Sequence, residues 1–433
     1  MPEAGKPAGS ASFIHPHLSF TTMSTIAALS SPPLIQAKPS LHRRRWLCRR
    51  TLGAGAALPL AFAAGLADTW TGLGRRPDAG RRKRMERSPQ WRDGRFHNPQ
   101  PIRSDFWKAI GAAMRPSPHA RPPGLLATAK VDPSALRVAP ETGLRITWLG
   151  HSTTLIEIDG FRVLTDPVWG GRASPVDWLG AERWYEPPLA LAELPEIDAI
   201  LISHDHYDHL DHRTIIALKN NPATFIVPLG VGAHLEYWGV PKARIVELDW
   251  WETTRIGSLR ITSTPARHAS GRVVFDKDLT LWSGYALTGP GHRVYFSGDT
   301  GMQAAFADIA EKLGPFDATL IEAGEYNASW PDWHIGPEQA VAAHRIVKGG
   351  VLIPIHWGLF NLAPHTWTEP VERVLAAAAG AGVTVATPRP GESVEPAAPP
   401  ATTRWWPELP WSRADETPIV STFDGRKPAA FAQ

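Results

Sequence analysis

The chain has 433 residues, 43% of them hydrophobic, which is enough for one large folded domain with extensions. Its single cysteine, Cys48, excludes internal disulfides and a cysteine-based metal site. The net charge is only +3, but residues 41–95 carry +10, so the remainder of the chain carries −7. The basic segment is not interleaved with aromatic residues or placed on a fold motif, which argues against nucleic acid as a partner.

The first 67 residues predict a disordered n-region followed by an export signal or a membrane anchor. The arginine-rich stretch RRRWLCRR at 43–50 precedes an uncharged stretch of 17 residues at 51–67, whose weak hydrophobicity suits a signal sequence. The paired arginines resemble a twin-arginine signal, so we expect a protein that is exported to the periplasm or associated with a membrane. A retained anchor and a cytoplasmic protein are the alternatives.

Composition divides the rest of the chain into three parts. Residues 68–142 are rich in Arg, Pro and Gly and predict a basic linker or extension with one short helix near 106–114. Residues 391–433 predict an irregular, Pro-rich tail. Residues 143–390 alternate strand-like and helix-like segments and predict the folded domain.

Within that domain, apolar runs and helical periodicity define the expected elements. Strands are predicted at 144–150, 154–158, 161–166, 197–203, 224–228, 244–248, 258–265, 281–287, 292–298, 317–323, 351–356 and 383–388. Helices are predicted at 212–220, 230–238, 301–313, 337–348 and 369–380. The early strands follow one another directly and the later ones are separated by helices. This order predicts an α/β (α+β) domain of packed sheets with helices outside.

The stretch LISHDHYDHL at 201–210 carries three histidines and two aspartates directly after a buried-looking strand. His204 and His206 are two residues apart and can converge on one metal ion. Asp208 and His209 can face a second ion from the same loop. A single ion does not need four ligands from one tight loop, so this spacing predicts a site for two neighbouring cations.

Three more candidate ligands, His268, Asp299 and His356, each follow or end an apolar run. A carboxylate has two oxygens and can bridge two cations, so Asp299 is the predicted bridge. The first cation is assigned to His204, His206, His268 and Asp299, and the second to Asp208, His209, Asp299 and His356. Imidazole and carboxylate ligands suit zinc best, with iron or manganese as alternatives. One histidine after a strand is usually a surface residue, but this combined pattern favours a metal site.

Three polar residues are predicted to support the site. Asp166 follows a strand and could hydrogen-bond a ligand histidine and fix its tautomer, or simply form a turn before Pro167. His334 lies just before a predicted helix and could protonate a leaving oxygen or bind phosphate, or be an exposed histidine at a helix start. His151 could lie behind a metal ligand, although a capping or packing role fits equally well.

These motifs resemble the metallo-β-lactamase superfamily, and more closely its N-acylphosphatidylethanolamine phospholipase D branch. The resemblance covers 144–387 and is carried by LTDPVWGGRASP, LPEIDAILISHDHYDHLD, ELDWWE, FSGDTG, GPFDATLI, HIGPEQAV and IHWGLF. It implies an αββα sandwich, here with an irregular N-terminal extension, and a phosphodiesterase with two zinc ions. It also implies that the products are phosphatidic acid and an N-acylethanolamine. His209 and the lack of a cysteine ligand disfavour a β-lactamase.

The expected partner is therefore a phospholipid or another phosphodiester, with association with a membrane surface left open. Two alternatives remain at this stage: a related metallohydrolase acting on a soluble phosphorylated sugar or lactone, and a non-catalytic zinc-binding protein. A pocket without Trp or Leu would favour the soluble substrate. Five tryptophans near the motif loops could line an acyl-chain channel or simply pack in the core: Trp169, Trp178, Trp330, Trp333 and Trp357.

Overall fold

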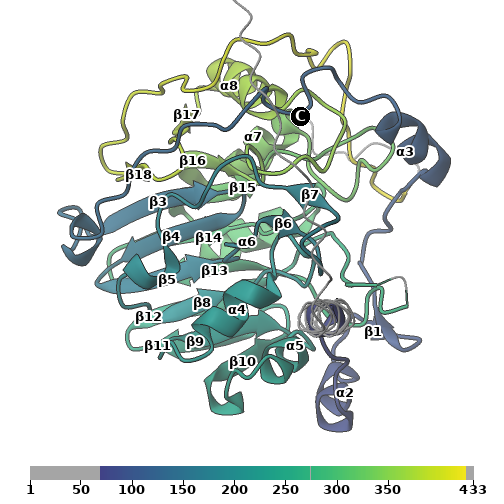
Figure 1. Cartoon of the computed structure of the whole chain (residues 1–433), viewed down its shortest axis with the longest axis vertical. Coiled ribbons are helices and arrows are strands. Elements are labelled where there is room, and N and C mark those ends of the chain that lie inside the picture. The colour runs from purple at the N-terminus through teal and green to yellow at the C-terminus, as the bar shows by residue number, and fades with distance from the viewer. Residues whose placement is uncertain (1–68, 274, 426–433) are drawn as a thin grey trace, which may run out of the picture. The chain divides into compact units, whose positions relative to one another are not determined.

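The computed structural model describes residues 69–273 and 275–425, and its main feature is a pair of seven-stranded sheets lying face to face (Figure 1). The first sheet has the order β10 (Ile245–Leu248), β9 (Thr224–Pro228), β8 (Ala199–Leu201), β5 (Phe161–Thr165), β4 (Thr153–Ile158), β3 (Leu144–Gly150) and β18 (Ser393–Val394). The second has the order β11 (Thr253–Ile256), β12 (Leu259–Thr264), β13 (Gly284–Thr288), β14 (Arg293–Phe296), β15 (Phe316–Glu322), β16 (Gly349–Ile355) and β17 (Thr384–Val385).

Successive side chains of each central strand point to opposite faces of its sheet, one into the core between the sheets and the next into the core under the helices. In β8, Ala199 and Leu201 pack between the sheets, whereas Ile200 packs under the helices on the outer face. In β16, Ile353 likewise faces the space between the sheets and Leu352 faces the helices. Both faces of these strands are buried, which explains why their sequences are continuously apolar instead of alternating with polar residues.

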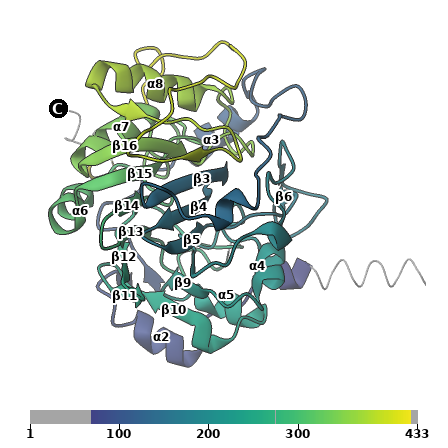
Figure 2. The same ribbon diagram turned by 90° about the vertical axis from the view of Figure 1, so that its left-hand side faces the viewer.

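Helices cover the outer face of each sheet. On the first sheet these are α4 (His212–Leu218) and α5 (Gly232–Tyr237), and on the second α6 (Ala305–Leu313), α7 (Pro337–Ile346) and α8 (Glu369–Ala381). Figure 2 shows α4 and α6 on opposite sides of the stacked sheets. The predicted αββα sandwich is thereby confirmed. No helix in the described ranges combines the length and the apolar character that a membrane span requires.

The shorter elements lie mostly in the N-terminal extension and in connecting loops. They are α2 (Ala79–Met85), β1 (Trp91–Arg92), β2 (Arg95–Phe96), α3 (Phe106–Ala113), β6 (Arg172–Ala173), β7 (Ala181–Glu182) and the 3-10 turns Ala135–Arg137, Leu191–Glu193 and Lys242–Arg244. The extension packs on the domain through polar contacts: the indole of Trp238 donates to Thr71 O at 2.7 Å, and Arg272 donates to Gly72 O. The predictions for residues 1–67, including the export signal, lie outside the described residues.

Two strands extend the sheets beyond the expected elements. The edge strand β11 pairs with β12, but its four residues TTRI include a single apolar side chain, which gives no clear sequence signal. The second, β18, pairs antiparallel with β3 at Val394 and Ile146. It lies within the stretch 391–433, so the first sheet continues into the Pro-rich segment.

His344 on α7 provides a test of packing that is independent of the site. Its Nδ1 lies 2.7 Å from the Thr319 hydroxyl, and burial lowers the pKa of His344 from 6.5 to about 4. The unfolded chain therefore binds a proton at a pH where the native protein does not, and the free energy of unfolding should fall by about 2 kcal/mol between about pH 7.5 and about pH 5. Urea unfolding at both pH values should show that His344→Asn loses this part of the pH dependence. An unchanged pH dependence in the variant would contradict the assignment.

Candidate metal centre

Polar side chains gather at one edge of the two sheets because strands of the same direction end there. The strands β3, β5 and β8 run parallel to one another, as do β12, β14, β15 and β16. Each is followed or ended by a titratable residue: His151, Asp166, His204, His268, Asp299, Glu322 and His356, in that order. The carboxyl ends of parallel strands form the usual ligand-binding edge of a sheet, so this convergence is a property of the topology.

The first predicted ligand set is brought together in the structure. His206 Nδ1 lies 2.8 Å from His204 Nε2 and 3.2 Å from His268 Nε2. Oδ2 of Asp299 lies 3.8 Å from His204 Nε2 and 3.7 Å from His268 Nε2. His204, His268 and Asp299 are buried and His206 is half-buried. Three imidazole nitrogens and one carboxylate oxygen therefore face a single point.

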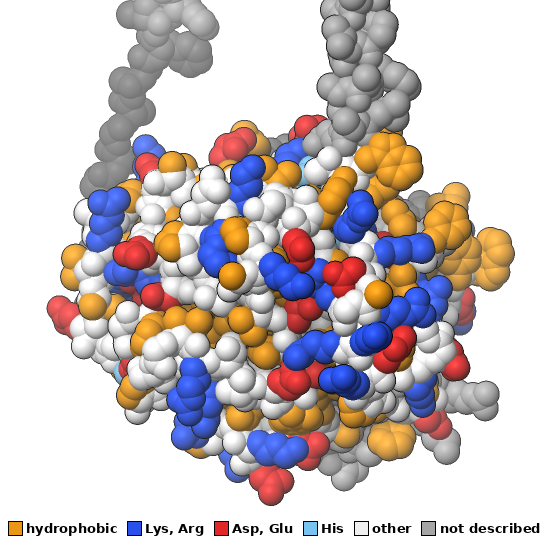
Figure 3. All heavy atoms as spheres, turned by 90° about the horizontal axis from the view of Figure 1, so that it is seen from below, with side chains coloured by type: hydrophobic (Ala, Val, Ile, Leu, Met, Phe, Trp, Pro, Cys, Tyr) orange, Lys and Arg blue, Asp and Glu red, His pale blue; other side chains and the backbone are white. Residues whose placement is uncertain are grey.

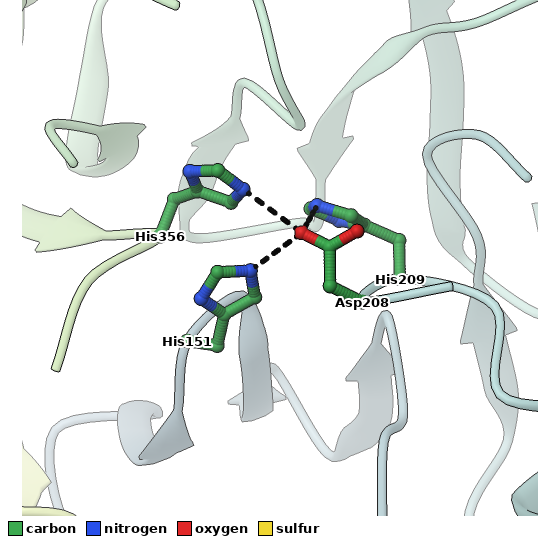
Figure 4. Close-up of side chains that lie close together, drawn as sticks. All are labelled: His151, Asp208, His209 and His356. Atoms are coloured by element: carbon green, nitrogen blue, oxygen red, sulfur yellow. Dashed lines mark hydrogen bonds and ion pairs between the residues drawn. The ribbon is translucent and has the colours of Figure 1, made fainter. Parts of the chain in front are cut away.

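The second predicted set also converges, and Figure 4 shows three of its members, Asp208, His209 and His356, together with His151. Asp208 Oδ2 lies 3.2 Å from His209 Nε2 and 3.3 Å from His356 Nε2. Asp299 Oδ2 lies 3.1 Å from the same two nitrogens. Asp299 is thus shared by both sets, as expected for a bridging residue.

The donor set fits two divalent cations. Asp299 Oδ1 is buried and has no hydrogen-bond partner, although buried polar atoms rarely lack one. Within the described ranges, candidate ligand atoms lying within 4.8 Å of one another include His204, His206 and His268 as one group and Asp208, His209 and His356 with His151 as another. Imidazole nitrogens with carboxylate oxygens are the ligands that zinc, iron and manganese accept.

Protonation prepares the first set for cation binding, whereas two rings of the second set must first lose a proton. Burial and the neighbouring charge of His209 lower the pKa of His204 well below its usual value, and burial lowers the pKa of His268 in the same direction. Burial opposes ionisation of Asp299, but the charges of His209 and His356 outweigh it and hold the pKa of Asp299 well below the usual range. Burial lowers the pKa of His209 and His356 too, but the charge of Asp299 outweighs it and holds both pKa values well above the usual range. Neutral imidazoles and an ionised carboxylate are the forms that bind a metal ion, so cation binding to the second set releases protons from these rings.

Asp166 lies behind the second set. Its carboxylate accepts from His209 Nδ1 at 2.7 Å, from Ser203 N at 2.7 Å and from the Ser203 hydroxyl at 2.6 Å. It is fully buried and does not line the cavity beside the cluster. Asp166 therefore orients His209 and has no contact with that cavity, which is the tautomer-fixing contact predicted from sequence and not a direct catalytic one.

Two further residues complete the cluster, and sequence reasoning missed one of them. Glu322 ends β15 and accepts from His334 Nδ1 at 2.8 Å, so it orients that ring, and it lies 3.6 Å from His356 Nδ1. A lone acid at the end of the apolar run DATLIEA was the available signal. His151 Nε2 lies 2.9 Å from Asp208 Oδ2, and the His151 carbonyl accepts from His356 N. His151 therefore lies against the predicted ligands Asp208 and His356, which agrees with the prediction that it could lie behind a metal ligand.

A cavity of about 320 Å³ opens beside the cluster. Besides five residues of the cluster, His206, Asp208, Asp299, His334 and His356, it is lined by Ser104, Glu325, Trp330, Trp333 and Leu362. Of the five tryptophans named above, only Trp330 and Trp333 line it. Trp357 is buried and stacks on Trp148, Trp169 packs with the outer core of the first sheet, and Trp178 is exposed. The wider tryptophan channel is therefore wrong.

Asp332 holds the loop that carries Trp330, Trp333 and His334. Its carboxylate accepts from Thr422 N at 2.5 Å, from the Thr422 hydroxyl at 2.6 Å and from Arg103 N at 2.7 Å. Arg267 pairs with it at 3.1 Å. Segments from both ends of the described chain thus meet at one fully buried carboxylate and fix one wall of the cavity.

Comparison with known proteins agrees with this geometry. A family model described as Beta-lactamase superfamily domain matches residues 161–357. An uncharacterised protein of Mycobacterium tuberculosis is 46% identical over 381 residues, which cover 85% of this chain and 96% of that protein. N-acyl-phosphatidylethanolamine-hydrolyzing phospholipase D 1 of Caenorhabditis elegans is 40% identical over 247 residues, covering 54% of this chain and 69% of the relative. A metal-dependent hydrolase of Methanopyrus kandleri is 30% identical over 260 residues, covering 58% of this chain and all of that protein.

The family model covers the segment from β5 to the residue after His356, which includes six of the seven strand ends described above. The identity to the phospholipase extends over more than two thirds of that relative. Together with the sandwich and the His/Asp cluster, these matches decide the family. The chain belongs to the metallo-β-lactamase superfamily, as a metal-dependent hydrolase of the branch that resembles N-acylphosphatidylethanolamine phospholipase D.

Proposed function

We propose that the protein is a phosphodiesterase with two zinc ions that converts an N-acylphosphatidylethanolamine-like phospholipid into phosphatidic acid and an N-acylethanolamine. The observation that carries the proposal is Asp299 Oδ2, which lies within 3.1–3.8 Å of the Nε2 atoms of four histidines: His204, His209, His268 and His356. One oxygen shared by two imidazole sets supports two adjacent cations. Such a pair supplies activated water and offsets the negative charge of a phosphoryl group.

The cavity lining favours a phospholipid over a soluble phosphorylated sugar or lactone. A purely polar pocket would favour the soluble substrate, but Trp330, Trp333 and Leu362 line the cavity beside the cluster. Flat indole rings and a leucine offer apolar surface to the glycerol and acyl portions of a lipid. The phospholipase relative in Caenorhabditis elegans supports the same substrate class.

His334 is the residue we assign to proton transfer. Its Nδ1 donates to Glu322 at 2.8 Å, which fixes the ring, and its Nε2 makes no hydrogen bond to any described residue. Water attacks phosphorus and gives up a proton, the bond from phosphorus to the ethanolamine oxygen breaks, and that oxygen takes a proton from His334 Nε2 as it leaves. The proton given up by the water replaces the one lost by His334, so the ring returns to its starting form. The ring lines the cavity and is therefore within reach of a bound substrate.

His334→Gln should therefore lower the turnover of a phosphodiester by about 10²–10³-fold while leaving the metal content unchanged, because general acid catalysis contributes on that order. Steady-state kinetics and metal analysis of the same preparation measure both quantities. His292→Gln is the matched control, since that ring pairs with Asp159 away from the cavity. A loss of metal in His334→Gln would assign the ring to ligand support instead.

Removal of metal tests the proposal as a whole. The full-length protein should contain about two zinc ions per chain, lose its activity on dialysis against a chelator and regain it with zinc. Mass spectrometry of the products from N-acylphosphatidylethanolamine should then show phosphatidic acid and N-acylethanolamine. A fully zinc-loaded protein that leaves glycerophospholipids intact but hydrolyses another ester would disprove the lipid substrate. The conclusion that the protein is a metal-dependent hydrolase would remain valid.

A further inference from the structure

One helix of the N-terminal extension exposes apolar side chains that nothing in the described chain covers. In α3 (Phe106–Ala113) no residue is buried. The exposed fractions are 66% for Phe106, 78% for Trp107 and 38% for Ile110, and Met114, directly after the helix, is 77% exposed. A short helix gains little stability from its own hydrogen bonds, so apolar residues on every turn of an uncovered helix suggest a partner surface.

The ends of the α3 segment are fixed to the loops that form the catalytic cavity. Asp105 N donates to Ser329 O at 2.8 Å, and Ser117 N donates to Pro364 O at 2.7 Å. These two loops carry Trp330 and Leu362, which line the cavity, and Ser104 lines it directly before the helix. The helix therefore projects beside the cavity as a segment held at both ends.

The charge around α3 is positive. Residues 101–125 contain four cations, Arg103, Lys108, Arg115 and Arg121, all of them exposed, and a single carboxylate, Asp105. Asp105 is paired with Lys108 at 3.3 Å. In Figure 1, α3 stands at the upper right of the molecule; on the lower face, seen in Figure 3, Lys and Arg lie among Asp and Glu side chains.

We propose that α3 docks the protein on an anionic glycerophospholipid surface, so that the cavity faces the lipid from which its substrate comes; this inference rests on the proposed phospholipid substrate. Phe and Trp beside an Ile and a Met, flanked by Lys and Arg, are the composition of an interfacial helix. Cations beside the apolar residues attract acidic headgroups. A second copy of the chain fits less well, because two such helices in contact would bring their Arg and Lys side chains together.

The test compares variants of the full-length protein for binding to vesicles. Wild type should sediment with vesicles of phosphatidylcholine containing about 30 mol% phosphatidylglycerol, and more weakly with phosphatidylcholine alone. The fourfold variant Phe106→Ser, Trp107→Ser, Ile110→Ser and Met114→Ser should bind at least about tenfold more weakly. Lys108→Glu with Arg115→Glu should lose the preference for phosphatidylglycerol.

Matched control variants replace an exposed apolar side chain or an exposed cation elsewhere on the surface. Val138→Ser changes a side chain that is 66% exposed near β3, and Arg255→Glu reverses an exposed charge on β11; both variants should bind vesicles like wild type. Hydrolysis of bis-p-nitrophenyl phosphate, which needs no membrane, should be equal in all variants. This readout shows that the fourfold variant is folded.

The remaining outcomes separate this inference from the proposed function. Unchanged vesicle binding by the fourfold variant would overturn the docking site. The docking site would also be overturned, in favour of contact with a second copy, if the wild type did not bind vesicles and was dimeric by light scattering while the fourfold variant was monomeric. Vesicle binding that depends on α3 in a protein that cleaves no phospholipid would retain the docking site and remove the proposed substrate.

Discussion

Asp299→Asn is expected to lower the hydrolysis of a phosphodiester by about 10³-fold or more, a loss of about 4 kcal/mol in transition-state stabilisation. The carboxylate is 3% exposed, and its Oδ2 lies 3.1 Å from Nε2 of both His209 and His356. An amide keeps the shape of this side chain but removes its negative charge and offers only one oxygen. Both predicted cations then lose their shared ligand.

The decisive measurement is the metal content of the Asp299→Asn protein, determined on the same preparation as the rate of hydrolysis. We expect fewer than two zinc ions per chain in Asp299→Asn, because the bridge belongs to both sets. Asp317→Asn is the matched control: its carboxylate accepts from Arg293 N where β14 begins, at the opposite edge of the same sheet. An Asp299→Asn protein with two zinc ions and wild-type turnover would exclude Asp299 from the site.

Asp166→Asn should lower the affinity for the second cation about 10–100-fold and reduce the free energy of unfolding by about 2–4 kcal/mol. The Asp166 carboxylate accepts three hydrogen bonds, from His209 Nδ1, Ser203 N and the Ser203 hydroxyl. An amide nitrogen in place of Oδ2 cannot accept from His209. The proton of the His209 ring then moves to Nε2, the atom that faces Asp208 and Asp299. A protonated Nε2 has no free lone pair and cannot bind a cation.

The backbone does not complicate this experiment. Asp166 has φ +33, a conformation that asparagine tolerates nearly as well as aspartate. Chelator competition reports zinc affinity, and urea unfolding reports stability. Asp198→Asn serves as control because its carboxylate also accepts from a backbone N–H, that of Arg162, away from the cluster. Wild-type zinc affinity in Asp166→Asn would show that His209 keeps its tautomer without Asp166.

The candidate metal ligands could be predicted because each one interrupts an apolar run. A buried strand such as AIL at 199–201 must be followed by the chain leaving the core, so His204 and His206 stand out at its end. The same reasoning located His268, Asp299 and His356. Since parallel strands end at a common edge, order along the chain was enough to predict convergence in space.

Other parts of the site could not be predicted, for different physical reasons. Glu322 occupies the last position of a strand, where a single acid resembles an ordinary polar end, and its role depends on two rings that approach from other loops. Ser104 reaches the cavity from a segment without periodicity. The contact between Arg103 N and Asp332 spans 229 residues, and no local pattern encodes such a separation.

The clamp on Asp332 has a consequence for the order in which the protein matures. Thr422 is 90 residues downstream of the carboxylate that it holds, and the loop carrying His334 depends on that contact. While the chain is being synthesised, the sheets and most metal ligands can form well before Thr422 has left the ribosome. A nascent chain thus brings the His/Asp cluster together early and still lacks an ordered cavity wall, which delays hydrolysis until synthesis has passed this residue.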